Sequence, residues 1–302
     1  MSEPQATVMG PTTPPPVIVS ADELVRPLIK VSVMGIAGAG KSHFAGTFPK
    51  PMLVLLCDPD GKDTPYVERG IVLEPLKYGD LNQPVTRVMS LRQPDRELIR
   101  IEQFEDRTYD DPDGFLRLLS RLDVAAREVE QGMWRTIVLD GYSFAQFLAM
   151  EMRSRGQFTA PLDRRTQEPM VAAYATGDIE RLVWGRLRAL RCNVVMPCHI
   201  DEDRDEAHGK QLRNPKAPGR MRQGTTAAFP ESYRVYTVTS PDGTIVRQLQ
   251  TQPDNDFNCF SQSIHAPSPC WPDYNSLWPN WETNERAKRQ KVAAILKGEA
   301  TT

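Results

Sequence analysis

The fold of this chain is decided by the stretch Gly35-Ile36-Ala37-Gly38-Ala39-Gly40-Lys41-Ser42. The stretch matches the pattern GxxxxGKS/T at every fixed position, and that pattern forms a loop that binds phosphate. An apolar run from Leu28 to Met34 precedes it and predicts a buried strand. Residues 42–47 follow it and predict a short helix, which Pro49 ends. A strand before the loop and a helix after it are the context that the pattern requires.

The residue types of this loop suit the chemistry of phosphate binding. Small residues let the backbone wrap around phosphates with its N–H groups pointing inward, and the following helix adds a favourable dipole. In such loops the lysine, here Lys41, bridges the β- and γ-phosphates, and the hydroxyl, here Ser42, binds Mg²⁺. A chance glycine-rich turn is the alternative, which the flanking strand and helix disfavour. The sequence therefore predicts that a nucleoside triphosphate, ATP or GTP, binds here with Mg²⁺.

A second group that orients the metal is expected at the end of another strand. The apolar run Thr136-Ile-Val-Leu139 predicts a core strand, and Asp140 follows it. An aspartate at the carboxyl end of such a strand is the Walker B pattern, which holds Mg²⁺ directly or through water. The alternative is that Asp140 caps the helix expected to begin near Ser143. The metal role is preferred, because a phosphate-loop fold needs a strand with an aspartate here.

A catalytic base must come from elsewhere, because the residue after Asp140 is Gly141 and not glutamate. Asp58 and Asp60 follow the apolar run Met52–Leu56, which predicts a second core strand. A carboxylate at that strand end could reach an attacking water, and Asp60 is the preferred candidate. The alternative is an ordinary Asp-Pro-Asp-Gly turn.

His199 is a candidate contact for the γ-phosphate. It follows the run Asn193–Met196, which predicts a fourth core strand. Open α/β sheets bind ligands at the carboxyl ends of their strands, so a histidine there could report hydrolysis to the segment behind it. A histidine with a purely structural role is the alternative.

Strand and helix patterns alternate along the chain, which predicts an α/β fold with a mainly parallel sheet flanked by helices. Helices are expected at 112–130, 143–155 and 171–190, a further strand at 98–104, and a β-hairpin at 231–238 and 244–249. Residues 61–96 predict a long excursion from the core, and residues 201–230 a mobile loop. We expect a disordered segment 1–24, an ATPase domain 25–252, and an irregular tail 253–302 that ends in a helix at 281–297.

The composition restricts the classes of protein to consider. The 302 residues are 40% hydrophobic and 25% charged, with a formal net charge of −2, which is normal for a soluble globular protein. No apolar run approaches the roughly 20 residues that span a bilayer, and the proline-rich start does not resemble a signal peptide. We therefore expect no membrane partner and a cytoplasmic location, in the host if the gene is viral. Five scattered cysteines favour buried thiols over a disulfide framework or a zinc site.

The order of these motifs resembles that of the RecA-like phage ATPases of the AAA type, a group that includes ATPases associated with single-strand annealing and recombination. The resemblance covers residues 31–42, 48–60, 136–143 and 194–199. It implies a RecA-like P-loop core, ATP hydrolysis, and action on or near DNA in phage replication or recombination. It also implies that Lys41, Ser42 and Asp140 contact ATP and Mg²⁺, with an acidic residue after the second strand as the base.

The resemblance further implies partners. RecA-like ATPases commonly form homo-oligomers in which a neighbouring subunit supplies an arginine or lysine, and a recombination or single-strand-binding protein is a further candidate partner. RecA-like proteins place DNA-binding loops just after the γ-phosphate sensor. Here that place holds five basic residues that could contact single-stranded DNA: Lys210, Arg213, Lys216, Arg220 and Arg222. The same stretch opens with five acidic residues between 201 and 206, so a solvated loop of mixed charge is the alternative.

Two other functions remain open. A small-molecule kinase would share the phosphate loop and need a mobile arginine-bearing lid, for which the candidates are Arg153, Arg155, Arg164 and Arg165. A nucleotide-dependent scaffold would use the tail, where Trp271, Trp278 and Trp281 form either an interaction surface or a cover for the sheet. The sequence does not separate ATP from GTP, since no motif that reads the base stands out.

Overall fold

A computed structural model describes residues 24–58, 66, 74–75, 87–106, 112–156, 175, 177–205, 210–216, 224–225, 228–254 and 256–296. The segment 1–24 therefore lies outside the described residues except for Leu24, and so do Asp60, Arg164, Arg165, Arg220 and Arg222. The chain forms two compact units, one of residues 28–281 and one of residues 1–27 together with 282–302. In the second unit Arg26 binds Glu282 at 2.9 Å.

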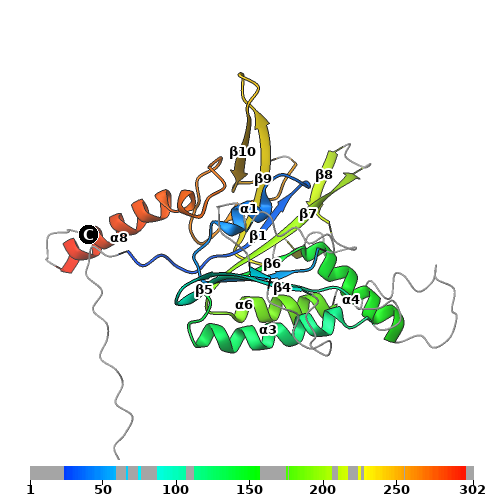
Figure 1. Cartoon of the computed structure of the whole chain (residues 1–302). Coiled ribbons are helices and arrows are strands. Elements are labelled where there is room, and N and C mark those ends of the chain that lie inside the picture. Colours follow the sequence, from blue (N-terminus) through cyan, green and yellow to red (C-terminus); the bar gives the residue numbers. More distant parts are fainter. Residues whose placement is uncertain are drawn as a thin grey trace, which may run out of the picture. The chain divides into compact units, whose positions relative to one another are not determined.

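The larger unit is built on one mixed sheet (Figure 1). Among the described residues, nine strands follow one another in the order β10-β9-β1-β7-β6-β2-β5-β4-β3. Neighbours from β9 to β5 are parallel, and the outer pairs β10–β9, β5–β4 and β4–β3 are antiparallel. The strands are β1 Lys30–Gly35, β2 Met52–Leu56, β3 Glu74–Pro75, β4 Arg87–Gln93, β5 Arg96–Gln103, β6 Thr136–Asp140, β7 Asn193–Asp205, β9 Glu231–Thr239 and β10 Ile245–Gln250.

Both faces of this sheet are covered, which is why its central strands are mostly apolar. Every residue of β2 and β6 is buried, the pattern of a parallel sheet covered on both sides. One face packs against α3 Gly114–Glu130, α4 Tyr142–Gly156, the π-helical segment η1 Ile179–Trp184 and α6 Gly185–Ala189 (Figure 1). The other face packs against α1 Lys41–Gly46 and against side chains from the tail, among them Ile264 and Trp278.

The mixed α/β fold with a mostly parallel sheet is confirmed, and most of its expected elements are present. The strands at 98–104 and 136–139, the helices at 112–130 and 143–155, and the hairpin at 231–249 lie within one or two residues of the bounds expected, whereas β7 is longer than the expected strand at 193–196. The described part of the expected helix 171–190 is helical from Gly177 to Ala189, and α8 Pro279–Leu296 corresponds to the terminal helix. No helix in the described ranges is long and apolar enough to cross a membrane.

Two expectations about irregular segments were wrong. Residues 61–96 were expected to leave the core, but β4 forms a hairpin with β5, and its Met89 and Leu91 are buried. Residues 201–230 were expected to form a loop, but β7 continues to Asp205 and pairs with β8 Lys210–Pro215. The register of this hairpin places Glu202 opposite Arg213 and Asp205 opposite Lys210.

The tail contributes to the larger unit up to Trp281, beyond the boundary at residue 252 that we expected. Phe257, Ile264, Leu277 and Trp278 are buried in the cores, and the short strand β11 Phe260–Ser261 pairs with β9. The 3₁₀ helix η2 Tyr274–Leu277 lies against α1, where the backbone N–H of Tyr274 donates to the hydroxyl of Thr47 at 2.9 Å.

Candidate functional site

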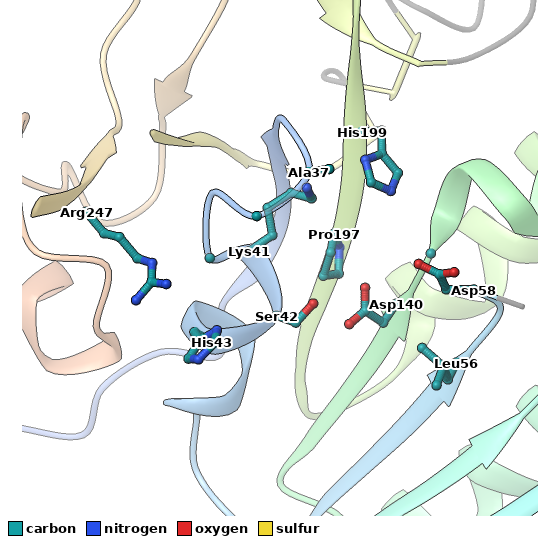
Figure 2. A pocket seen from close by; sticks show the side chains of 13 residues that line it. Ala37, Lys41, Ser42, His43, Leu56, Asp58, Asp140, Pro197, His199 and Arg247 are labelled. Carbon is teal, nitrogen blue, oxygen red and sulfur yellow. The ribbon is translucent and has the colours of Figure 1, made fainter. Parts of the chain in front are cut away.

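The ends of four parallel strands meet at one edge of the sheet. The register places Gly35, at the end of β1, beside His199 of β7, and Leu56, at the end of β2, beside Asp140 of β6. A cavity of about 390 Å³ opens there (Figure 2). Its walls include the phosphate-loop residues Ala37, Gly38, Gly40, Lys41 and Ser42, and the strand-end residues Asp58, Asp140, Gly141, Pro197 and His199, together with His43, Leu56 and Arg247.

The loop from Gly35 to Ser42 requires its glycines. Gly38 and Gly40 have φ angles of +78° and +102°, in the left-handed region that other residues rarely adopt. A Cβ atom on Gly35 would lie 2.7 Å from the carbonyl oxygen of Val235, and one on Gly40 would lie 2.7 Å from Cδ of Arg247. The three glycines therefore allow both the turn of the backbone and its close approach to β9 and β10.

Lys41 lies inside the curve of this loop. Its side-chain Nζ donates hydrogen bonds to the carbonyl oxygens of Gly35 and Ile36, each at 2.9 Å. The residue is buried, so its ammonium group is held within the cavity and not in bulk solvent. A cation in this position attracts the negative oxygens of a bound phosphate chain.

Asp140 faces Ser42, the second residue of the helix α1. Its carboxylate accepts hydrogen bonds from the hydroxyl of Ser42 and from Oη of Tyr66, the latter at 2.5 Å. Burial raises the pKa of Asp140, while these hydrogen bonds and the nearby charge of Lys41 act against the rise. A divalent cation beside the carboxylate would favour its ionised form, because the positive charge would offset the cost of burying a negative one. The hydroxyl and carboxylate predicted as the metal-binding pair thus lie together.

Asp58 lies beside Asp140 because β2 and β6 are neighbours. The N–H of Cys57 donates to the carbonyl oxygen of Asp140 at 2.9 Å, and Asp58 itself is buried and lines the cavity. Gly141 has φ +78°, and a Cβ atom there would lie 2.8 Å from the backbone nitrogen of Asp58. A glutamate after Asp140 would therefore push the two strand ends apart. The other predicted base, Asp60, lies outside the described residues.

His199 connects the cavity to the β7–β8 hairpin. Its ring lies 6.2 Å from that of Phe144 on α4, and β7 runs on through it without a break. At the end of β8, the N–H of Lys216 donates to the carbonyl oxygen of His199 at 2.6 Å, and the Lys216 carbonyl accepts from the Ser143 hydroxyl at 3.1 Å. Both arms of the hairpin therefore leave the sheet at His199. Lys216 is exposed, and only the backbone of Lys210 and Arg213 is described.

Three residues of the site were not predicted from the sequence. Tyr66 lies in the segment 61–96 that was assigned to an excursion, so nothing in its neighbourhood indicated a place beside Asp140. His43 directly follows Ser42 and lines the cavity. Arg247 was expected only as a member of the hairpin, and the alternation of exposed and half-buried residues along β10 gives no sign that it faces the phosphate loop.

Of the described residues, those considered for a kinase lid (Arg153), for an interaction surface of the tail (the three tryptophans) and for a zinc site (the cysteines) do not line this cavity. Arg153 binds Asp178 through two hydrogen bonds of 2.6 and 2.8 Å, so it joins α4 to the following helix. Trp278 is fully buried and Trp281 packs against it at 5.5 Å, as cover for the sheet, whereas Trp271 is 65% exposed. Four of the five cysteines are buried, and burial raises the pKa of Cys192, Cys198 and Cys259 to about 12.

The donor set suits Mg²⁺ bound together with phosphates. Among the residues that the structure describes, no group of three or more His, Cys, Asp or Glu side chains could hold a metal. Mg²⁺ does not need such a group, since it retains water ligands and is usually held by one or two carboxylates and the oxygens of a substrate phosphate. The Ser42 hydroxyl and the Asp140 carboxylate could therefore hold Mg²⁺ together with phosphate oxygens and water. Comparison with protein-family models finds none that matches this chain, and comparison with curated proteins finds no similar one.

Proposed function

We propose that this chain is a Mg²⁺-dependent ATPase with a RecA-like P-loop core. The observation that carries the proposal is that Lys41, Ser42 and Asp140, distant in sequence, face one cavity beside a loop with two left-handed glycines. The strand order supports it too, because β7 lies between β1 and β6. A RecA-like core likewise has one strand between the phosphate-loop strand and the Walker B strand.

In this proposal each residue of the cavity has a separate role in hydrolysis. The loop and Lys41 would hold the phosphate chain, and Mg²⁺ at Ser42 and Asp140 would neutralise charge on the β- and γ-phosphates. The Asp58 carboxylate would orient a water and accept its proton while the water oxygen attacks the γ-phosphorus. The bond from the γ-phosphorus to the bridging oxygen then breaks, and ADP and inorganic phosphate leave. His199, beside Gly35, would contact the γ-phosphate.

We propose further that turnover is coupled to single-stranded DNA, in phage recombination or replication. The resemblance noted above suggests this role, and the geometry of the β7–β8 hairpin supports it. Since both arms of the hairpin meet at His199, a movement of His199 on loss of the γ-phosphate would reach Lys210, Arg213 and Lys216 directly. Basic residues on a hairpin would contact DNA phosphates without reading sequence.

The test is phosphate release from ATP by the full chain, with and without Mg²⁺ and single-stranded DNA. Wild-type turnover should need Mg²⁺ and rise with DNA. Lys41→Ala should lower it about 100- to 1,000-fold, the usual cost of removing one group that stabilises the transition state. Lys288→Ala is the matched control, because Lys288 is an exposed lysine on α8 and is not among the residues that line the cavity.

Other results would point to the alternative functions. Transfer of phosphate to an added nucleoside, with no effect of DNA, would favour a small-molecule kinase. ATP binding that changes the assembly state of the chain, without phosphate release, would favour a scaffold. Equal turnover in wild type and Lys41→Ala would contradict the proposal itself.

A further inference from the structure

A second cavity of about 750 Å³ adjoins the one at the phosphate loop. The two share His43 and Arg247 as lining residues, so they adjoin one another beside α1. The far side of the second cavity is formed by the start of β10, at 244–247, and by residues 271–273 of the tail. None of these residues has a part in the hydrolysis described above.

The positions of the residues around the phosphate loop indicate how a bound nucleoside triphosphate would be oriented. Asp140, Asp58 and His199 lie on one side of the phosphate loop, and Arg247 lies on the other (Figure 2). The γ-phosphate belongs with the metal-binding pair, because Mg²⁺ bridges the β- and γ-phosphates. The opposite end of the nucleotide must then leave the loop toward Arg247 and His43, which is where the second cavity begins.

Trp271 is an exposed indole on a firmly held segment. It is 65% exposed, although the next tryptophan along the chain, Trp278, is fully buried. On one side Cys270 exchanges two backbone hydrogen bonds with Leu249, of 2.8 and 3.0 Å. On the other side Tyr274 is bonded to the hydroxyl of Thr47. A large apolar ring that is held in place and left open to solvent beside a cavity is typical of a binding surface.

Arg247 lies where the two cavities meet. Its side chain lies against Gly40, close enough that a Cβ atom there would come within 2.9 Å of Nε. Within the part of the chain that the structure describes, no hydrogen bond or ion pair engages its guanidinium group. Arg247 and Trp271 also line a smaller hollow of about 210 Å³, so the two side chains are near neighbours.

We propose that this second cavity receives the nucleoside of the bound triphosphate, with Trp271 stacked on the base and Arg247 bound to the phosphate nearest the ribose. The inference rests on the proposed function, and it names the residues that bind the part of the substrate remote from the chemistry. An aromatic ring offers a face to any base, and a guanidinium group binds phosphate oxygens in a planar fork. The two residues thus have separable roles.

The experiment compares binding of ATP with binding of inorganic tripolyphosphate, both with Mg²⁺, by calorimetry on the full chain. Trp271→Ala should weaken ATP binding about tenfold, within the range measured for loss of one base–aromatic stack, and leave tripolyphosphate binding unchanged. Trp271→Phe should retain most of the affinity for ATP. Arg247→Ala should weaken both ligands, while Arg286→Ala, at an exposed arginine on α8, should weaken neither.

The outcomes separate this inference from the proposed function. If Trp271→Ala binds ATP as tightly as wild type while Lys41→Ala binds neither ligand, the inference is overturned and the phosphate-loop site stands. If wild type binds neither ligand, both fail. If Trp271→Ala raises the KM for a phosphate acceptor and leaves the affinity for ATP unchanged, the inference is also overturned. The second cavity would then hold a second substrate and not the nucleoside of ATP. Melting curves of Trp271→Ala and Trp271→Phe establish that both variants are folded.

Discussion

Asp140 shows how a site residue can oppose the stability of the free protein. Its carboxyl group is buried, and burial holds its pKa above the usual value of 3.8 despite hydrogen bonds from Tyr66 and Ser42. A group with a raised folded pKa binds its proton more tightly in the folded state than in the unfolded state. As pH rises from 3.8 through the folded pKa, the free energy of unfolding therefore falls. Above the folded pKa, the ionised Asp140 therefore destabilises the ligand-free protein.

Asp140→Asn should therefore raise the melting temperature of the ligand-free protein by a few degrees at pH 7, because the buried charge is gone. The difference from wild type should shrink as the pH is lowered toward 4, where wild-type Asp140 takes up a proton. The same variant should lose the Mg²⁺-dependent rise in melting temperature that ATP gives the wild type. Thermal melts from pH 4 to 8, with and without MgATP, measure both effects.

Asp123→Asn is the control for this prediction. The guanidinium of Arg186 binds the Asp123 carboxylate at 2.7 Å and lowers its pKa, so removal of that charge should give no gain in stability. A lower melting temperature for Asp140→Asn than for wild type at pH 7 would contradict the account of Asp140.

At the scale of elements, the turn between β6 and α4 lies against the end of β2 and sets how closely the ends of β2 and β6 approach. Gly141 has φ +78°, and its Cα faces the backbone of Asp58 at a distance that leaves no room for a side chain. The turn thus brings Asp58, the proposed base, and Asp140, the proposed Mg²⁺ ligand, to the same cavity. A larger residue here would act on the site through β2, without touching substrate.

Gly141→Ala should lower stability more than the cost of its backbone conformation alone, and it should also lower ATP turnover. The matched control is Gly132→Ala, since Gly132 has φ +76° with no atom within 4 Å of a Cβ. The control should cost about 1–2 kcal/mol, the price of a left-handed alanine, and leave turnover intact. Denaturant melts and phosphate release measure the two variants. Equal losses of stability, with turnover unchanged, would show that the contact with Asp58 has no effect.

At the scale of the whole molecule, the tail up to Trp281 is part of the unit that contains the sheet. Trp278 and Leu277 are fully buried against the core that also holds Phe44 and Phe48 of the α1 region. Tyr274 packs on Phe48 with ring centroids 5.0 Å apart and on Trp278 at 5.4 Å. The helix that follows the phosphate loop is therefore supported from outside by residues more than 200 positions later in the chain.

A chain that ends at residue 252 should consequently melt far below the full chain or fail to fold. The loss of a single large buried aromatic side chain already costs about 3–5 kcal/mol, and this truncation removes several buried residues. A chain that ends at Asn284 keeps all of them and should melt close to the full chain. Circular dichroism melts of the two truncated chains provide the comparison. Similar melting of the 252-residue chain and the full chain would show that the tail does not support the core.

Features of the fold and of the site could be predicted from the sequence where they depend on residues close together in the chain. Features that depend on contacts between distant segments could not. Lys41 and Ser42 could be singled out because the pattern that contains them is local. The strands β2 and β6 could be predicted because burial on both faces favours a run of apolar residues. The β7–β8 hairpin gave no such signal, because its residues are charged and lack an alternating apolar pattern. Tyr66 and Arg247 were missed because each meets the site through contacts between distant segments.

The sequence by itself determined the phosphate loop, the apolar strands and the alternation of strand and helix, since these depend on residue types at short and regular spacings. Only the tertiary structure decided that Asp140 faces Ser42, that Tyr66 bonds to Asp140, and that Arg247 and Trp271 line a second cavity next to the first. Strand order and register set those neighbours, and both depend on which distant segments pair when the chain buries its apolar surface.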